Sequence, residues 1–180
     1  MSIRMSILCL VLVAGLSIGT LAGAHEPIKT PGAVADENPG PTLGMPVYVQ
    51  NIDPAAAEAV KVVDAFSAAI KAVKLDEAEK LLDPQVLILE SGSSERSRDE
   101  YMRTHIIADA AFLQNAKQQL RYRQARADGN MAWVATESTL TGQQNGKAVV
   151  LSSTETMLLK KTTAGWRIAH IHWSSRPQNK

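Results

Sequence analysis

Apolar residues at helical spacing dominate the middle of the chain. Asp53 followed by Pro54 is a typical helix start, with Asp as the cap and Pro in the first turn. The residues that follow place an apolar side chain every three or four positions, which predicts a long helix; they are Val60, Val63, Ala65, Phe66, Ala69, Ile70 and Val73. A short second helix is expected over 75–82, ended by Asp83-Pro84, and an apolar strand over 86–89.

A third helix and four strands complete the predicted pattern. Ser97 and Glu100 have the spacing of a capping box, so a helix is expected from there to about Leu113. Alternating residues then predict four strands joined by three hairpin connections; they cover 120–127, 131–141, 149–161 and 166–175. This order predicts an α+β domain, with about three N-terminal helices packed on one face of a curved, mainly antiparallel sheet.

The first 24 residues have the features of a secretory signal peptide. Arg4 precedes an apolar stretch over 7–21, and Ala22-Gly23-Ala24 provides the small residues of a cleavage site. A periplasmic or secreted location is therefore expected, with no stable membrane anchor after cleavage. The only cysteine, Cys9, leaves with this segment, so the mature chain has no disulfide. The Pro/Gly-rich residues 25–52 are expected to form a flexible leader before a single domain over 53–176.

Charge and motif content exclude several classes of function. The chain has 19 basic and 18 acidic residues, and loss of Arg4 brings the two numbers level. An even charge balance gives no electrostatic attraction for nucleic acid, so no nucleic-acid partner is expected. The sequence also lacks a phosphate-binding glycine loop and the HExxH and CxxC motifs, and no cofactor is predicted.

The expected last strand carries two closely spaced histidines. Strict alternation would place His170 and His172 on one face of the sheet and Ile171 and Trp173 on the other. Such a histidine pair can chelate copper or zinc, although no third ligand follows nearby in the sequence. The N-terminal His25 of the mature chain is a second conceivable copper site. Structural or interface histidines are the favoured alternative.

Three polar residues of the helix expected after Ser97 form the first candidate for acid–base chemistry. Tyr101, His105 and Asp109 are spaced four residues apart and would share one helix face. His105 and Asp109 could act as a base and its orienting carboxylate, with Tyr101 as a hydrogen-bond donor. A competing apolar face, which would turn the three polar side chains toward water, consists of Met102, Ile106, Ala110 and Leu113.

Two glutamates on expected strands are further candidates. Glu90 ends an apolar strand beside a serine-rich loop, and Glu155 lies in the middle of a strand. Burial would raise the pKa of either carboxyl toward a value useful for proton transfer. The alternatives are a solvated loop position for Glu90 and a salt bridge for Glu155, with Arg121, Arg123 or Arg167 as its partner.

The end of the chain carries a family resemblance. A Gly-Trp turn opens a terminal strand that reads Trp-Arg-Ile-Ala-His-Ile-His-Trp-Ser, after helices and strands in the order given above. Over about 54–175 the chain resembles the nuclear transport factor 2-like (NTF2-like) superfamily, and most of all its small SnoaL-like or DUF4440-type domains. The resemblance implies a cone-shaped fold with a pocket between the helices and the sheet. This fold serves many functions, so it does not select one.

The same end is similar to the association domain of calcium/calmodulin-dependent kinase. The two pocket arginines of that domain fall at Trp173 and Met157 here, which disfavours an anionic ligand. The comparison also turns His170 and His172 outward, onto a sheet face that such domains commonly use for dimer packing.

Three functions remain open at this point. The leading hypothesis is an exported domain, dimeric through its sheet face, that binds a small apolar or amphipathic molecule. Its pocket would be lined by Trp133, Met157, Ile171 and Trp173. The second hypothesis is an isomerase, cyclase or dehydratase that uses His105 with a pocket carboxylate, and Tyr101 to stabilise an oxyanion. The third is periplasmic copper or zinc handling through His170 and His172.

Overall fold

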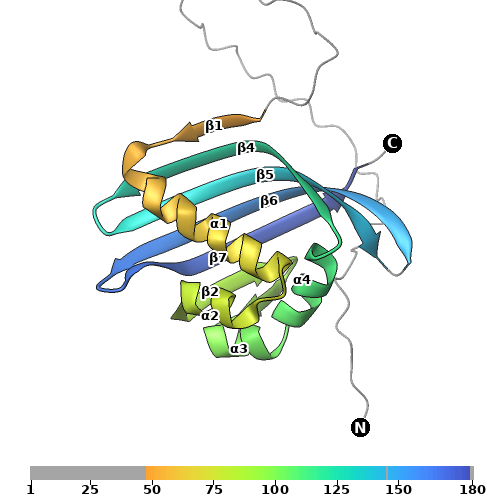
Figure 1. The fold of residues 1–180 in the computed structure, drawn as a ribbon, viewed down its shortest axis with the longest axis horizontal. Helices are drawn as coiled ribbons and strands as arrows, with labels where there is room; N and C mark the ends of the chain where they lie inside the picture. Colours follow the sequence, from red (N-terminus) through yellow and green to blue (C-terminus); the bar gives the residue numbers. More distant parts are fainter. Residues whose placement is uncertain (1–47, 145, 179–180) are drawn as a thin grey trace, which may run out of the picture. The chain divides into compact units, whose positions relative to one another are not determined.

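The computed structural model describes residues 48–144 and 146–178 (Figure 1). The expected signal peptide over 1–24, and the expected leader up to residue 47 with His25, lie outside the described residues. Across the described ranges, no helix has both the length and the apolar character needed to span a membrane.

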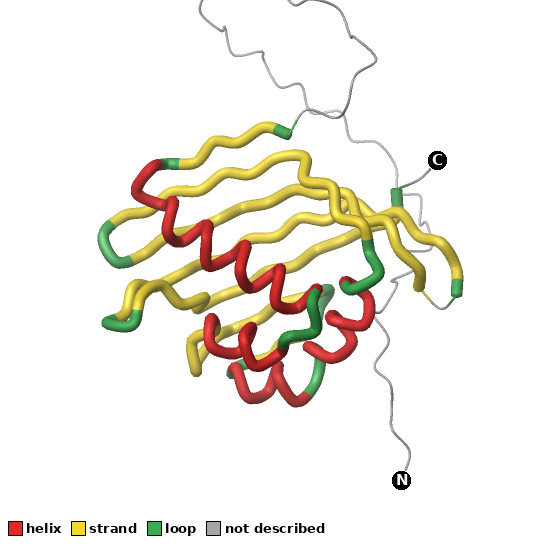
Figure 2. Tube along the Cα trace, in the orientation of Figure 1, coloured by secondary structure: helices red, strands yellow, loops and turns green. Residues whose placement is uncertain are grey.

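Four helices of the described chain precede the long strands, and α1 lies across one face of the sheet (Figure 2). A single 3-10 turn, Pro54–Ala56, leads into α1 (Ala57–Lys71), and the Asp53 carboxylate accepts a hydrogen bond from Ala55 N at 2.9 Å, as expected of a cap. The apolar stripe of α1 is buried in the core. The other helices are α2 (Leu75–Leu81), α3 (Arg98–Arg103) and α4 (Ile106–Leu113).

Seven described strands form one sheet in the order β1-β4-β5-β6-β7-β2-β3. The strands are β1 (Val49–Ile52), β2 (Leu82–Glu90), β3 (Ser93–Glu95), β4 (Lys117–Asp128), β5 (Met131–Gln144), β6 (Lys147–Thr162) and β7 (Gly165–Pro177). The β1–β4 and β2–β7 pairs are parallel and the others are antiparallel. The predicted α+β architecture, with helices on a curved and mainly antiparallel sheet, is confirmed.

The structure differs from the sequence-based prediction at several element boundaries. Residues 49–52, placed in the leader, form β1 and pair with β4. β2 begins at Leu82 and runs through Pro84, where the pairing with β7 is irregular and tolerates a residue without an N–H. β3 was not predicted, and the helix expected from Ser97 to Leu113 is broken into α3 and α4.

The predicted strict alternation of the last strand is wrong before His170. The β6–β7 pairing shifts by one residue there, so that Leu158 pairs with His170 while Leu159 pairs with Ile168. The extra residue, Ala169, turns the strand so that Ile168 and Ile171 both reach the core.

Two transverse rows of side chains on the helix-covered face position the site. Residues paired across neighbouring strands share a face, so each row follows from the strand register. We call the first the apolar row: Ala125, Val134, Met157, Ile171 and Ile88, all fully buried. We call the second, two residues along each strand, the polar row: Arg123, Thr136, Glu155, Trp173 and Glu90.

Candidate acid–base site

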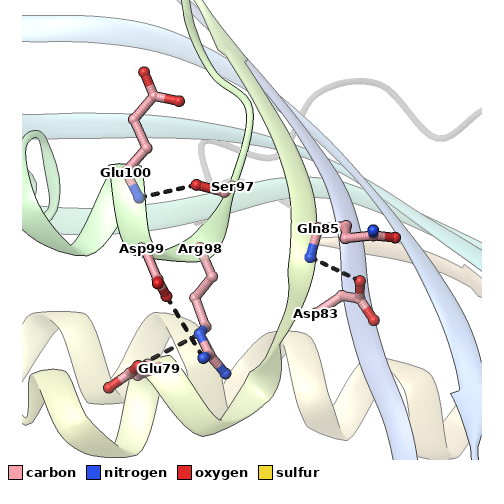
Figure 3. A network of polar contacts seen from close by, with 7 residues as sticks. All are labelled: Glu79, Asp83, Gln85, Ser97, Arg98, Asp99 and Glu100. Carbon is pink, nitrogen blue, oxygen red and sulfur yellow. Dashed lines mark hydrogen bonds and ion pairs between the residues drawn. The ribbon is translucent and has the colours of Figure 1, made fainter.

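The chain segment over the polar row is anchored by a capped helix start. Ser97 Oγ accepts a hydrogen bond from Glu100 N at 3.1 Å, as the capping-box spacing predicts (Figure 3). Glu100 reaches back to Arg96 N at 2.8 Å. Arg98 lies between Glu79 of α2 and Asp99, and its Nε is 3.4 Å from Glu79 Oε1, without the alignment of a hydrogen bond. These contacts fix α3 beside α2 and over β2.

The break between α3 and α4 falls in the middle of the predicted Tyr101–His105–Asp109 face. Thr104 leaves helical geometry (φ −119°, ψ −88°), and His105 becomes the residue that precedes α4. Tyr101 and Asp109 nevertheless meet, because the Tyr101 hydroxyl donates a 2.8 Å hydrogen bond to Asp109 Oδ2. The tyrosine is fully buried, so the predicted exposure of this polar face to water does not apply to it.

Burial changes the proton affinity of both members of this pair. It raises the pKa of Asp109 to about 6, while the hydrogen bond from Tyr101 and the nearby His105 lower it and Glu95 raises it further. Burial, together with the Asp109 carboxylate, raises the pKa of Tyr101 well above its ordinary value. At neutral pH Tyr101 therefore stays protonated and remains a hydrogen-bond donor.

His105 contacts a carboxylate that the sequence-based prediction missed. Its Nδ1 meets Oε1 of Glu95, which is 5% exposed, whereas the His105 side chain is 32% exposed. Glu95 pairs with Ile88 and so extends the apolar row on the edge strand β3. Because β3 was not predicted, Glu95 was assigned to no sheet face. The serine-rich segment before it contains no periodic signal that would have identified it.

Glu90 completes the acidic cluster at the end of the polar row. Burial raises its pKa to about 7, the nearby Asp109 and Glu95 carboxylates add to this, and His105 opposes it. Within the described ranges its side chain makes no hydrogen bond and no ion pair. Glu90 is thus a half-buried carboxyl with a pKa near neutrality, and its oxygens have no hydrogen-bond partner among the described residues. We refer to Glu90, Glu95, Tyr101, His105 and Asp109 as the acid–base cluster.

Glu155 belongs to the neighbouring part of the polar row. It accepts a 2.8 Å hydrogen bond from Trp173 Nε1. Burial raises the pKa of Glu155, and the indole hydrogen bond and Arg123 lower it. No ion pair joins it to any arginine in the described part of the chain: Arg123 instead binds Asp64 of α1 at 2.6 Å and donates to Thr136 Oγ1 at 3.3 Å. The Trp173 ring lies against Tyr101, with ring centroids 6.2 Å apart.

Three of the four residues predicted to line a pocket share the helix-covered face of the sheet, and Trp133 does not. Met157 and Ile171 are fully buried in the apolar row. Trp133 lies on the opposite face, because its neighbour Val134 faces the core. Only Trp173 reaches the acid–base cluster. A hollow of about 380 Å³ lies elsewhere, over one end of β4 to β7, and is lined by serine and threonine side chains with Arg121 and Arg176.

The histidine pair of β7 faces away from the helices. His170 Nδ1 donates to the Leu87 carbonyl at 2.8 Å, and His172 is exposed. Among residues 48–144 and 146–178, no three histidine, cysteine, aspartate or glutamate side chains are grouped to hold a metal ion. Self-association through this outer face stays a prediction.

Comparisons with known proteins place the fold in a family. The profile of the SnoaL-like domain matches residues 60–177. A candidate ketosteroid isomerase from Shewanella frigidimarina NCIMB 400 is similar over 69% of this chain and 99% of its own, at 30% identity and a TM-score of 0.63. A comparison with curated proteins found no match.

Two further solved structures share the fold. One is a candidate calcium/calmodulin-dependent protein kinase II association domain from Xanthomonas campestris, which is 24% identical over 70% of this chain and 93% of its own, with a TM-score of 0.58. The other is an NTF2-like superfamily protein from Salmonella enterica serovar Typhimurium LT2, which is 17% identical over 69% of this chain and 92% of its own, also with a TM-score of 0.58. The predicted NTF2-like fold is thus confirmed.

Proposed function

Because the chain belongs to the family of SnoaL-like domains, we propose that it is an enzyme that transfers protons on a small neutral carbonyl compound. The observation that supports this most directly is that two hydrogen-bonded or ionic pairs, Tyr101–Asp109 and His105–Glu95, lie close enough to Glu90 for Asp109, His105 and Glu95 to change its pKa. Buried titratable groups with shifted pKa values cluster at catalytic sites. The sequence favoured binding without turnover, and this geometry favours turnover.

Glu90 is the general base of the proposed reaction. With a pKa of about 7 it is largely ionised just above neutral pH and still a useful proton acceptor. It removes a proton from the carbon next to the carbonyl group, and the bonding electrons move toward the carbonyl oxygen to give an enolate. The protonated Glu90 then returns the proton to another carbon of the conjugated system. The result is an isomer of the substrate, with no net gain or loss of atoms.

Tyr101 and His105 have separate parts in this proposal. The Tyr101 hydroxyl, which stays protonated, is the neutral donor that stabilises the enolate oxygen. Its single proton is donated to Asp109 before a substrate enters, so this role requires the hydroxyl to leave Asp109. His105 is oriented by Glu95 and partly exposed, so it exchanges protons between the cluster and water.

The charges of the site favour an uncharged substrate. Its acidic side chains outnumber its cations, and the buried Arg123 is already bound to Asp64. An anionic substrate would therefore be repelled. This agrees with the expectation that Trp173 and Met157, which stand in place of two pocket arginines, disfavour an anionic ligand. The hollow of about 380 Å³ lies elsewhere, over one end of β4 to β7. The proposal therefore requires α3 and α4 to move when a substrate enters.

The test uses two β,γ-unsaturated ketones, cyclohex-3-enone and 5-androstene-3,17-dione, as probes. Their conversion to the conjugated isomers is followed by ultraviolet absorbance. We expect the full chain to catalyse at least one conversion, and Glu90→Gln to lower kcat by about 10²- to 10⁴-fold. Glu137→Gln, which changes an exposed glutamate on the outer face of the same sheet, should leave the rate unchanged. No acceleration of either ketone, or full activity of Glu90→Gln, would overturn the proposal.

A further inference from the structure

Glu155 makes no ion pair among the described residues, although Arg123 is near enough to lower its pKa. It lies in the middle of β6, between Thr136 of β5 and Trp173 of β7 in the polar row. The nearest cationic candidate in that row, Arg123, is bound to Asp64 and Thr136 instead. A buried carboxyl without an ion pair is unfavourable for folding. An ion pair therefore does not explain why a carboxyl occupies this position.

The contact that Glu155 does make is with the indole of Trp173. The indole N–H can only donate a hydrogen bond, and a buried donor without an acceptor destabilises the folded state. The Glu155 oxygen satisfies it at 2.8 Å. This hydrogen bond fixes the rotation of the Trp173 ring, which otherwise could turn about its two side-chain bonds.

Trp173 in turn meets the tyrosine of the acid–base cluster. The two rings are 6.2 Å apart between centroids and inclined by 47°, a tilted aromatic contact. At the other end of the Tyr101 ring, the hydroxyl donates a 2.8 Å hydrogen bond to Asp109 Oδ2. A continuous series of contacts thus runs from the sheet to α4: Glu155, Trp173, Tyr101 and Asp109.

We infer that Glu155 is a positioning residue, which holds the Trp173 ring by its hydrogen bond and thereby holds Tyr101 on Asp109. Glu155 acts in this through its oxygen as an acceptor, and its negative charge is not needed. The inference depends on the proposed function only where it concerns catalysis, because the contacts themselves exist without substrate.

The experiment compares Glu155→Gln with Glu155→Leu in the full chain. Gln keeps an acceptor for the indole N–H and lacks the charge, whereas Leu lacks both. The readout is the pKa of Asp109, measured by carbon-13 NMR of its carboxyl group. Asp109 is also faced by Glu90 of β2, Glu95 of β3 and His105, and these are unchanged in both variants.

We expect the pKa of Asp109 to stay at about 6 in Glu155→Gln and to rise by roughly one unit in Glu155→Leu. The rise follows because the Tyr101 hydrogen bond lowers this pKa, and loss of one such bond to a charged group changes proton affinity about tenfold. In protein labelled with 5-fluorotryptophan, the fluorine signal of Trp173 should move in the Leu variant only. Equal pKa changes in both variants, or no change in either, would overturn the inference.

A second variant keeps the test decisive if Glu155→Leu does not fold. Trp173→Phe retains an aromatic ring and removes the N–H donor, so it should raise the pKa of Asp109 as well. A wild-type pKa in folded Trp173→Phe would contradict the inference. Because no substrate is involved, failure of the ketone assay leaves this result intact, and the reverse also holds.

Discussion

The apolar row and the polar row lie two residues apart on the same strands and under the same helices, yet they have opposite compositions. The apolar row is fully buried and packs into the core. The polar row replaces this packing with an arginine, a threonine, two glutamates and a tryptophan, whose polar atoms each need a partner. Buried polar groups weaken a fold unless they are satisfied. The comparison therefore separates the part of the sheet that stabilises the domain from the part to which we assign chemistry.

The largest expected effect comes from opening the apolar row. Ile171→Ala removes a side chain that is 0% exposed, between Met157 and Ile88. It should lower the free energy of unfolding by about 2–5 kcal/mol, through lost burial and a residual cavity. Urea denaturation measures this change. The matched variant Ile107→Ala, at a side chain that is 62% exposed on α4, should stay within about 0.5 kcal/mol of wild type. Equal effects of the two would show that the row is not a core.

In the polar row we expect a smaller change in the free energy of unfolding, of opposite sign. The pKa of Glu90 is raised from 4.5 to about 7 in the folded chain, so folding favours its protonated form. Stability from this group is full below about pH 4.5 and is lost as pH rises through 7. Glu90→Gln should therefore stabilise the fold by about 1–3 kcal/mol at pH 8, and much less at pH 4.

Urea denaturation at pH 4 and pH 8 decides this prediction. Glu137→Gln, at an exposed glutamate, is the control and should show little change at either pH. A gain for Glu90→Gln that is the same at both pH values would mean that packing, and not ionisation, is responsible.

The smallest effect is a shift in proton affinity within the acid–base cluster. Tyr101→Phe removes the hydroxyl that donates to Asp109 and keeps the ring against Trp173. Since that hydrogen bond lowers the pKa of Asp109, its loss should raise the value above about 6. Carbon-13 NMR titration of the carboxyl group measures it. An unchanged or lower pKa would show that the hydroxyl does not stabilise the carboxylate.

Elements with strong local patterns could be predicted from the sequence, and those made by distant pairing could not. α1 and the strands β4 to β7 follow from periodicity and turn residues close to them in the chain. β3 has three residues and exists through its pairing with β2. The helix break at Thr104 occurs without a glycine or proline that would predict it from the sequence. Tertiary contacts override local preference at such positions.

The candidate site shows the same division. Tyr101, His105 and Asp109 were identified by their spacing, although the helix that was expected to align them is broken. The partner of His105, Glu95, depends on strand register across β2 and β3. Trp173 was expected as a pocket wall, and its bond to Glu155 follows from the β6–β7 register. Side-chain identity suggested the chemistry, and long-range pairing decided which groups meet.

The parallel pairing of β2 with β7 has a consequence for the order of folding. The antiparallel strands β4 to β7 are joined by short turns and can pair through local contacts. β2 must instead dock beside β7 from more than half the described chain away, and closing a long loop makes such contacts slow to form. Glu90 joins the polar row only through that docking. Loop closure therefore favours early pairing of the hairpin strands over the docking of β2, and the polar row is complete only once β2 lies beside β7.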